Sequence, residues 1–180
     1  MHRFTAAIAL VLLPILVNSA TPSNSRIAEL KTADQADRSP GGATLNVSLR
    51  DAERRAEIRS LLSQGLVRSA SDYLDAALIL QHGETPEDHQ LAYALATISL
   101  EIEPTRRVRF LVAATWDRIL WRRNKPQWYA TNYVREGDKW VLWTVDEAAI
   151  TEEERERMSG RTLEESKALA EKMNREASTR

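Results

Sequence analysis

Glycine and proline residues divide the stretch from Ser48 to Pro126 into four segments, each with apolar residues at helical spacing. The breaks fall at Gly65, Gly83 and Pro104. Glycine just after a periodic segment, or proline soon beyond it, is typical of a helix end. The sequence therefore predicts four consecutive helices in this stretch, joined by short connections.

The clearest helix start is the run from Thr85 to Asp88, which has proline in its second position and glutamate in its third. A threonine hydroxyl suits the N-cap, and proline suits the first helical position. The two acidic residues interact favourably with the positive end of the helix dipole. For the preceding helix, Ser69 or Ser71 is the predicted cap.

The hydrophobic period changes after Pro126. Residues 128–134 and 139–145 are rich in aromatic and β-branched side chains, and turn residues centred on Gly137 separate them. This pattern predicts a β-hairpin.

All five tryptophans lie between Trp116 and Trp143. In the second predicted strand, Trp140 falls on one face and Trp143 on the other, so both faces are apolar. Either both faces are covered, which is the commoner fate of tryptophan, or one face presents an aromatic surface to a sugar or a peptide strand.

Two further capping patterns, Thr151 with Glu154 and Thr162 with Glu165, predict two helices after the hairpin. The predicted fold is mainly α (α+β): a small helical bundle or array of about five to six helices, with one β-hairpin in the C-terminal half. The alanines and short connections resemble the stacked hairpins of tetratricopeptide-type arrays. Because no self-repeat of about 34 residues is present, a single bundle-like domain is favoured.

The N-terminus has the pattern of a secretory signal peptide. Arg3 precedes an apolar run from Phe4 to Val17, and small or polar residues follow up to Ala20. A run of this length is too short for a membrane-spanning helix, which needs about 20 apolar residues. We therefore predict a cleaved signal peptide over residues 1–20, and secreted or periplasmic protein with no membrane span after cleavage; an uncleaved anchor is the alternative.

Residues 21–44 are polar and small, with few bulky apolar side chains. This composition predicts a flexible linker. Residues 45–176 then form the single, mostly helical domain.

The composition excludes several classes of protein. The chain has no cysteine, which excludes disulfides, a thiol nucleophile, a thiolate metal site and a lipidated N-terminal cysteine. Its 25 Lys and Arg residues nearly balance 26 Asp and Glu residues, which argues against nucleic acid as a partner.

Two histidines, His82 and His89, flank the connection between the second and third predicted helices. If their rings face one another, they could share a proton or a divalent metal, with Asp88, Glu87 or Asp117 completing the set. The spacing is not that of a helical zinc site. The favoured interpretation is structural, with His82 at a helix C-terminus and His89 on a helix surface, so no metal and no cofactor are predicted.

Asp117 lies within a mainly apolar helical segment and is followed by Arg118. A buried carboxylate needs a cation or backbone donors, so a structural salt bridge is the favoured interpretation. The same segment is strongly basic, and the part after Asp146 is rich in glutamate. Either acidic C-terminal helices pack over the basic helix, or both are solvated, or the basic helix lines an anion-binding groove. The cations concerned are Arg106, Arg107, Arg109, Arg118, Arg122, Arg123 and Lys125.

Several short motifs together resemble an uncharacterised bacterial domain family of unknown function, over about residues 49–174. The motifs are Gln81-His82-Gly83, Asp88-His89, Asp117-Arg118 and Gln127-Trp128-Tyr129-Ala130-Thr131. The family shows a Gln-His-Gly turn, an Asp-Arg helix and an aromatic-Gly-Thr-Gln segment. This chain departs from the last motif, with Ala130 in place of glycine and Asn132 in place of glutamine.

The resemblance implies a shared fold and a shared candidate site, but no reaction. The site residues that it suggests are Gln81, His82, His89, Asp117, Arg118, Gln127, Tyr129 and Thr131. We expect His82, His89, Asp117 and Gln127 to line one cavity.

The predicted function is a non-enzymatic, exported helical binding module for a protein, a peptide or a cell-envelope component. The alternative is a hydrolase-like or metal-assisted enzyme using His82, His89 and Asp117. No serine-hydrolase elbow, zinc-protease helix, phosphate loop or dinucleotide fingerprint occurs in the sequence to support it.

Overall fold

The computed structural model describes residues 21–39, 41–42 and 45–178, so the predicted signal peptide lies outside the described residues. Within this part the chain forms seven helices and one two-stranded antiparallel hairpin, which confirms the mainly α prediction. The helices are α1 Ser25–Asp37, α2 Val47–Ser63, α3 Ala70–Leu80, α4 Pro86–Ile102, α5 Arg106–Arg122, α6 Glu152–Ser159 and α7 Leu163–Ser178. The strands are β1 Tyr133–Glu136 and β2 Lys139–Leu142.

Helix α1 corrects the prediction of a flexible linker over residues 21–44. Asn24 caps it by accepting a hydrogen bond from the backbone of Arg26. Ile27 and Leu30 are buried in the main core, and Asp34 is buried with them. Ile27 and Leu30 are too few to show a helical spacing of apolar residues in an otherwise polar segment. Tertiary packing, rather than an amphipathic pattern, stabilises this helix. Residues 40, 43 and 44 lie outside the described part.

The predicted helix starts are confirmed by their caps. Ser69 and Thr85 each form a capping box, in which the hydroxyl accepts from the backbone three residues on and that residue's carboxylate accepts in return. Their partners are Asp72 and Asp88. These caps fix the starts of α3 and α4, and the Thr85 cap borders the turn between the two helices.

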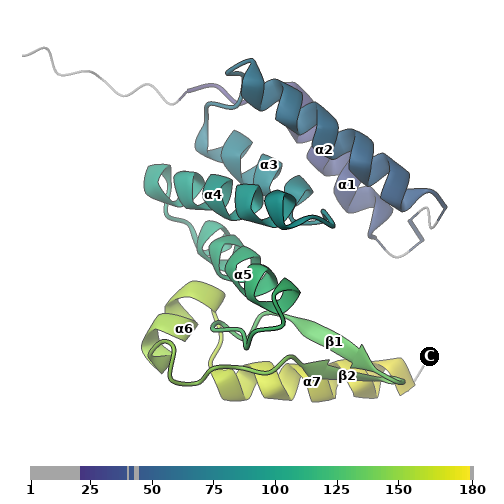
Figure 1. Ribbon diagram of the computed structural model, residues 1–180, viewed down its shortest axis with the longest axis vertical. Coiled ribbons are helices and arrows are strands. Elements are labelled where there is room, and N and C mark those ends of the chain that lie inside the picture. The colour runs from purple at the N-terminus through teal and green to yellow at the C-terminus, as the bar shows by residue number, and fades with distance from the viewer. Residues whose placement is uncertain (1–20, 40, 43–44, 179–180) are drawn as a thin grey trace, which may run out of the picture.

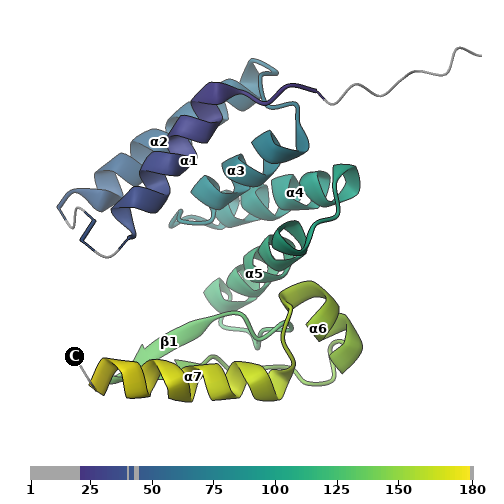
Figure 2. The same cartoon turned by 180° about the vertical axis from the view of Figure 1, so that it is seen from behind.

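The helices form two parts joined by α5 (Figures 1 and 2). Helices α1 to α4 pack together as the upper part, and α5 leads from α4 to the lower part, where α6, α7 and the hairpin lie. The main core draws its residues chiefly from α1 to α5, and Met158 of α6 joins it.

The hairpin is shorter than predicted, with Glu136 paired to Lys139 across a two-residue turn. Gly137 in the turn has φ of 60°, a left-handed conformation that favours glycine. Helix α7 packs along β2. Asn174 of α7 accepts from the N–H of Trp140 at 2.6 Å and donates to its carbonyl at 2.8 Å. Trp140 and Trp143 are both partly buried.

Across the described residues, no helix combines the length and apolar character that crossing a bilayer requires.

Candidate functional site

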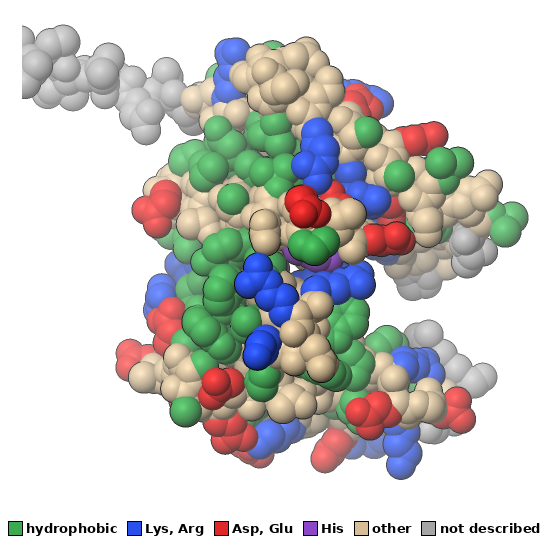
Figure 3. All heavy atoms as spheres, in the orientation of Figure 1, with side chains coloured by type: hydrophobic (Ala, Val, Ile, Leu, Met, Phe, Trp, Pro, Cys, Tyr) green, Lys and Arg blue, Asp and Glu red, His purple; other side chains and the backbone are tan. Residues whose placement is uncertain are grey.

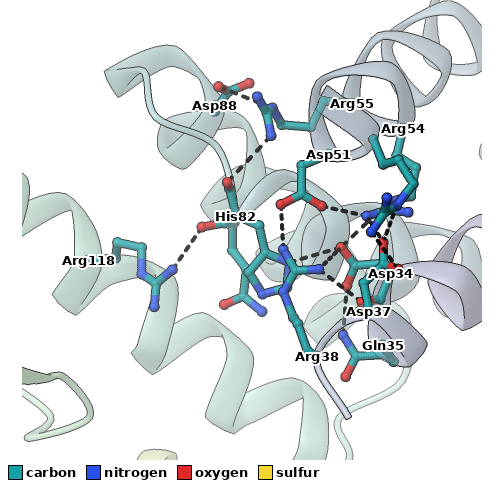
Figure 4. Close-up of polar contacts among 12 residues, drawn as sticks. Asp34, Gln35, Asp37, Arg38, Asp51, Arg54, Arg55, His82, Asp88 and Arg118 are labelled. Carbon is teal, nitrogen blue, oxygen red and sulfur yellow. Dashed lines mark hydrogen bonds and ion pairs between the residues drawn. The ribbon is translucent and has the colours of Figure 1, made fainter. Parts of the chain in front are cut away.

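An ion-pair network joins α1 to α2 and reaches the end of α3 (Figure 4). Arg54 of α2 bonds Asp51 at 2.6 Å and Asp37 of α1 at 2.8 Å. Arg38 bridges Asp34 and Asp51, at 2.9 and 2.7 Å. Hydrogen bonds from Arg50 and Arg54 lower the pKa of Asp37 to about 2. The sequence does not predict this network, because its members look like ordinary helix charges as long as α1 is not recognised as a helix.

His82 belongs to this network. Its Nδ1 lies 3.1 Å from Oδ1 of Asp34, and Figure 4 shows the ring directed toward α1. Asp34 has no exposed surface and also accepts from Arg38 and Gln35. An ionised Asp34 requires the Nδ1–H tautomer of His82, so the ring donates to a carboxylate and ties α3 to α1.

The turn after α3 is held by arginines from two other helices. Arg118 of α5 donates to the carbonyl of Gln81 at 2.9 Å, and Arg55 of α2 donates to the carbonyl of His82 at 3.4 Å. Two of the predicted site residues, Gln81 and Arg118, are thus joined by a direct contact, which anchors the α3–α4 turn.

Gly83 ends this turn against the side chain of Asp88. A Cβ added at Gly83 would overlap the Cβ and carboxyl group of Asp88. Asp88 itself caps α4 and pairs with Arg59 at 2.6 Å and Arg55 at 3.6 Å. The Gln-His-Gly motif therefore has a steric explanation, because only glycine lets the capping carboxylate come this close.

Asp117 is completely buried and holds the loop that precedes the hairpin. Its carboxylate accepts hydrogen bonds from the backbone N–H groups of Trp128, Tyr129 and Thr131, and from the Thr131 hydroxyl. Burial raises the pKa of Asp117, against the opposing effect of these donors. Its partners are backbone donors and a hydroxyl, so the predicted salt bridge is wrong.

Gln127 fixes the same loop from its other end. Its amide donates to the carbonyls of Asn132 and Trp143, and its side-chain oxygen accepts from the N–H of Asn132 at 2.8 Å. Between these anchors, Ala130 is fully buried with φ of 58°. Ala130 therefore occupies a left-handed position, which an alanine adopts under strain.

The predicted site residues thus fall into separate groups. Gln81, His82 and Arg118 belong to the α3–α4 turn, whereas Asp117, Gln127, Tyr129 and Thr131 belong to the loop before the hairpin. The expectation that His82, His89, Asp117 and Gln127 line one cavity gains no support from these contacts. In the ranges that the structure covers, no three His, Asp or Glu side chains are placed to hold a metal ion.

His89 is the predicted site residue whose ring nitrogens form no hydrogen bond with the described residues. Its side chain is buried, with the residue 1% exposed, and neither ring nitrogen has a hydrogen-bond partner among the described residues. Burial lowers its pKa to about 4, and the positive charges of Arg118 and Arg122 act in the same direction. The predicted helix-surface position is therefore wrong: the ring is an interior imidazole that stays neutral at pH 7.

The cations of α5 and of the turn after it differ from the arginines of α2. In the described part of the chain, Arg50, Arg54, Arg55 and Arg59 of α2 each pair with an aspartate. None of the seven cations between 106 and 125 forms an ion pair with a described carboxylate. Helix α6 packs on α5 without neutralising it, so the positive charge of α5 is left for solvent or a ligand.

Figure 3 shows where part of this charge gathers. Lys and Arg side chains lie on both sides of a histidine, at a notch between the upper and lower parts of the molecule. Arg118 of α5 is half-buried, and its Nε has no partner among the described residues. Burial lowers the pKa of Arg118, and repulsion from Arg122 and Arg38 adds to the effect.

Comparison with known proteins found no matching family, no matching curated protein and no matching solved structure. The resemblance to the uncharacterised bacterial family therefore stays a prediction.

Proposed function

We propose that this chain is an exported binding module, not an enzyme, and that it recognises an acidic protein, peptide or cell-envelope component through the basic face of α5 formed by Arg118 and Arg122 in its C-terminal half. The observation that carries the proposal is the contrast between α2, whose arginines pair with aspartates, and α5, whose cations form no ion pair with a described carboxylate.

The enzyme alternative loses the residues that it needs. The carboxylate of Asp117 accepts hydrogen bonds from the loop before β1, and His82 is hydrogen-bonded to Asp34. A general base must reach a proton of the substrate, and these two side chains are committed to structural contacts instead. Their arrangement supports a scaffold role.

Two neighbouring arginines without a carboxylate partner favour an anionic ligand; Arg118 is partly buried and Arg122 is exposed. Arg118 lies i, i+4 from Arg122 on α5, and the two raise the local positive potential together. A ligand carboxylate at this face would relieve the repulsion between them. Guanidinium groups also bind carboxylates in a bidentate manner, which gives the contact its geometry.

The test is calorimetric titration of the folded protein with an oligoglutamate peptide, with an oligolysine peptide of equal length as the control ligand. We expect saturable binding of oligoglutamate that weakens as salt rises, because screening reduces exposed charge interactions. The double variant Arg118→Gln/Arg122→Gln should bind at least about tenfold more weakly, a loss of about 1.4 kcal/mol.

The matched control is Arg26→Gln with Arg107→Gln. It removes the same charge at exposed positions: Arg26 on α1, which is paired with Glu57 of α2, and Arg107 near the other end of α5. Its affinity should stay close to that of the unaltered protein. Absence of oligoglutamate binding, or an equal loss in both double variants, would reject the basic face of α5 as the binding surface.

A further inference from the structure

Strand β1 has an outer edge whose backbone groups point away from β2. The register pairs Arg135 with Trp140 and Tyr133 with Leu142. In an antiparallel ladder, pairs that exchange hydrogen bonds alternate with pairs whose N–H and C=O groups point outward. Trp140 uses its own N–H and C=O to bind Asn174 of α7, so the pair that it forms with Arg135 is of the outward kind. Tyr133 lies two residues from Arg135, and its pair is of the same kind.

In the described part of the chain, the outer edge of β1 is left unpaired. Neither Arg135 nor Tyr133 has a backbone hydrogen bond to a helix, a loop or a side chain among the described residues. Strand β1 packs along β2, and α7 packs along β2 as well. Figures 1 and 2 show α7 below the hairpin, and the outer edge of β1 turned toward the upper part of the molecule. An edge of this kind binds an extended peptide by strand addition, in which main-chain hydrogen bonds supply affinity.

The start of β1 lies beside the basic face of α5. The carboxylate of Asp117 holds Thr131, two residues before β1, and Arg118 follows Asp117 on the helix. Figures 1 and 2 show β1 beginning next to the C-terminal end of α5. A peptide strand on the outer edge of β1 that continues past Tyr133 therefore leads toward Arg118 and Arg122. The edge and the basic face can act on one extended acidic ligand.

The two faces of β1 carry opposite charges. Arg135 is exposed, and its guanidinium carbon lies 4.9 Å from the ring centre of Trp140. Glu136 is exposed on the other face, because successive residues of a strand point to opposite sides. In an added strand, the residue opposite Arg135 is its cross-strand neighbour on the same face, where an opposite charge stabilises the pair. An acidic residue on the side of Arg135 should therefore be followed by an uncharged residue on the side of Glu136.

We propose that the outer edge of β1 binds an extended segment of the acidic ligand as a third strand, with acidic residues at alternate positions on the side of Arg135. The inference rests on the proposed function, because it adds the conformation and the residue pattern of the ligand that the basic face of α5 attracts. A strand of four residues offers only the outward backbone groups of Tyr133 and Arg135, so charge contacts with Arg135 and α5 supply the rest of the affinity.

Hydrogen exchange followed by NMR tests the edge directly. The probe is a blocked peptide of alternating threonine and glutamate, because threonine favours the strand conformation. When this peptide saturates the folded protein, the amide protons of Tyr133 and Arg135 should exchange at least about tenfold more slowly. The amide of Val134 points toward Val141 and is the internal control, with little change expected. Absence of binding, or unchanged exchange at Tyr133 and Arg135 in the saturated protein, would overturn the inference.

Two N-methylated forms of the peptide test pairing through the backbone. One form carries methyl groups on the amide nitrogens of the glutamates, and the other carries them on those of the threonines. In a strand paired along one edge, alternate N–H groups face the neighbouring strand. One form should therefore bind at least about tenfold more weakly, because it loses its hydrogen bonds to β1, while the other keeps its affinity. Equal affinity of the two forms would reject strand addition.

Two variants test the predicted pattern of charge. Arg135→Gln should weaken binding of the alternating peptide about two- to fivefold, the range of one cross-strand charged pair. Lys139→Gln removes the same charge from β2 and should leave the affinity unchanged, because Lys139 is paired with Glu136 on the other face of the hairpin. Equal affinity of Arg135→Gln and the unaltered protein would contradict the inference.

The outcomes separate the strand site from the basic face of α5. If oligoglutamate binds through Arg118 and Arg122 while exchange at the edge of β1 stays unchanged with both peptides, the strand inference fails and the proposed function stands. If the alternating peptide slows this exchange but the double variant Arg118→Gln/Arg122→Gln binds it equally well, the proposed binding face fails and the strand site is retained. Slowing that rises with protein concentration in the absence of peptide would assign the edge to a second copy of the chain and overturn the inference.

Discussion

Thr131 donates both its backbone N–H and its hydroxyl to the same carboxylate oxygen of Asp117, at 3.1 and 2.8 Å. The other oxygen of Asp117 accepts from the N–H of Trp128 at 2.8 Å. One buried side chain on α5 therefore fixes the path of the loop into β1. This carboxylate acts for the loop as a cap acts for a helix, because it satisfies several backbone donors that would otherwise be buried without partners.

Replacing Asp117 with asparagine should destabilise the protein by about 1–3 kcal/mol. The amide has one oxygen, so its NH₂ group must face either the donors from Thr131 or the donor from Trp128. Chemical denaturation followed by circular dichroism would measure the loss. As a smaller perturbation, Thr131→Val removes only the hydroxyl and should cost less than Asp117→Asn. A free energy of unfolding unchanged in Asp117→Asn would show that the loop is not anchored through this carboxylate.

Gly83→Ala should destabilise the protein by about 1–3 kcal/mol, the usual cost of overpacking. The added methyl overlaps Asp88, which caps α4 and pairs with Arg59. The melting temperature and the far-ultraviolet helix signal would both be measured. Ala94→Gly, at an exposed position of α4, serves as the comparison because it perturbs the same helix through propensity alone. If Gly83→Ala melts at the original temperature, the close contact with Asp88 is not required.

The burial of His89 should make the protein less stable in mild acid. Its pKa is about 4 when folded and about 6.5 when unfolded, so between these values the unfolded chain binds a proton that the folded chain does not. The contribution of neutral His89 is therefore fully present above pH ~6.5 and is lost as the pH falls toward 4, by at most about 1.4 kcal/mol per pH unit.

Free energies of unfolding measured across this window would show the slope. His89→Gln should flatten it, since the variant has no imidazole to protonate. His82→Gln also removes one imidazole and should retain the part of the slope that belongs to His89. An identical slope in His89→Gln and the unaltered protein would contradict the assignment.

Export predicts a shortened N-terminus. Mass spectrometry of protein recovered from the periplasm or the medium should find a new first residue between Ser19 and Ser23, because the small residues of a cleavage site follow the apolar run. Substituting arginine for two leucines of that run should retain the full-length chain inside the cell. If the unaltered protein is recovered only as the full-length chain in the cytosol, the export hypothesis is contradicted.

Local sequence signals predicted the elements whose ends are fixed by nearby residues. Thr85 with Asp88, and Ser69 with Asp72, satisfy each other within one turn, so their spacing alone marks α3 and α4. Helix α1 has no such signal in its apolar residues. Its stability comes from packing on α3 and from Asp34, whose partner His82 is 48 residues away.

The sequence pointed to residues that make specific contacts, but it did not predict which of them lie together in the structure. Asp117 reaches donors 11 to 14 residues further along the chain, and Arg118 reaches the carbonyl of Gln81 on another helix. Neighbours in sequence therefore serve different parts of the fold, and no spacing rule separates them. Burial of His89 was equally hidden, because its position in the first turns of α4 suggests exposure until α5 is packed against it.

The side chain of Asn174 occupies both backbone groups of Trp140, as a neighbouring strand would. A two-stranded hairpin has open edges, and an open edge is a template on which a second molecule can add its own strand. At β2 that template is already filled at its centre by an amide from α7, which ends the sheet after two strands. The outer edge of β2 is thereby blocked at Trp140 against pairing with a strand of a second molecule.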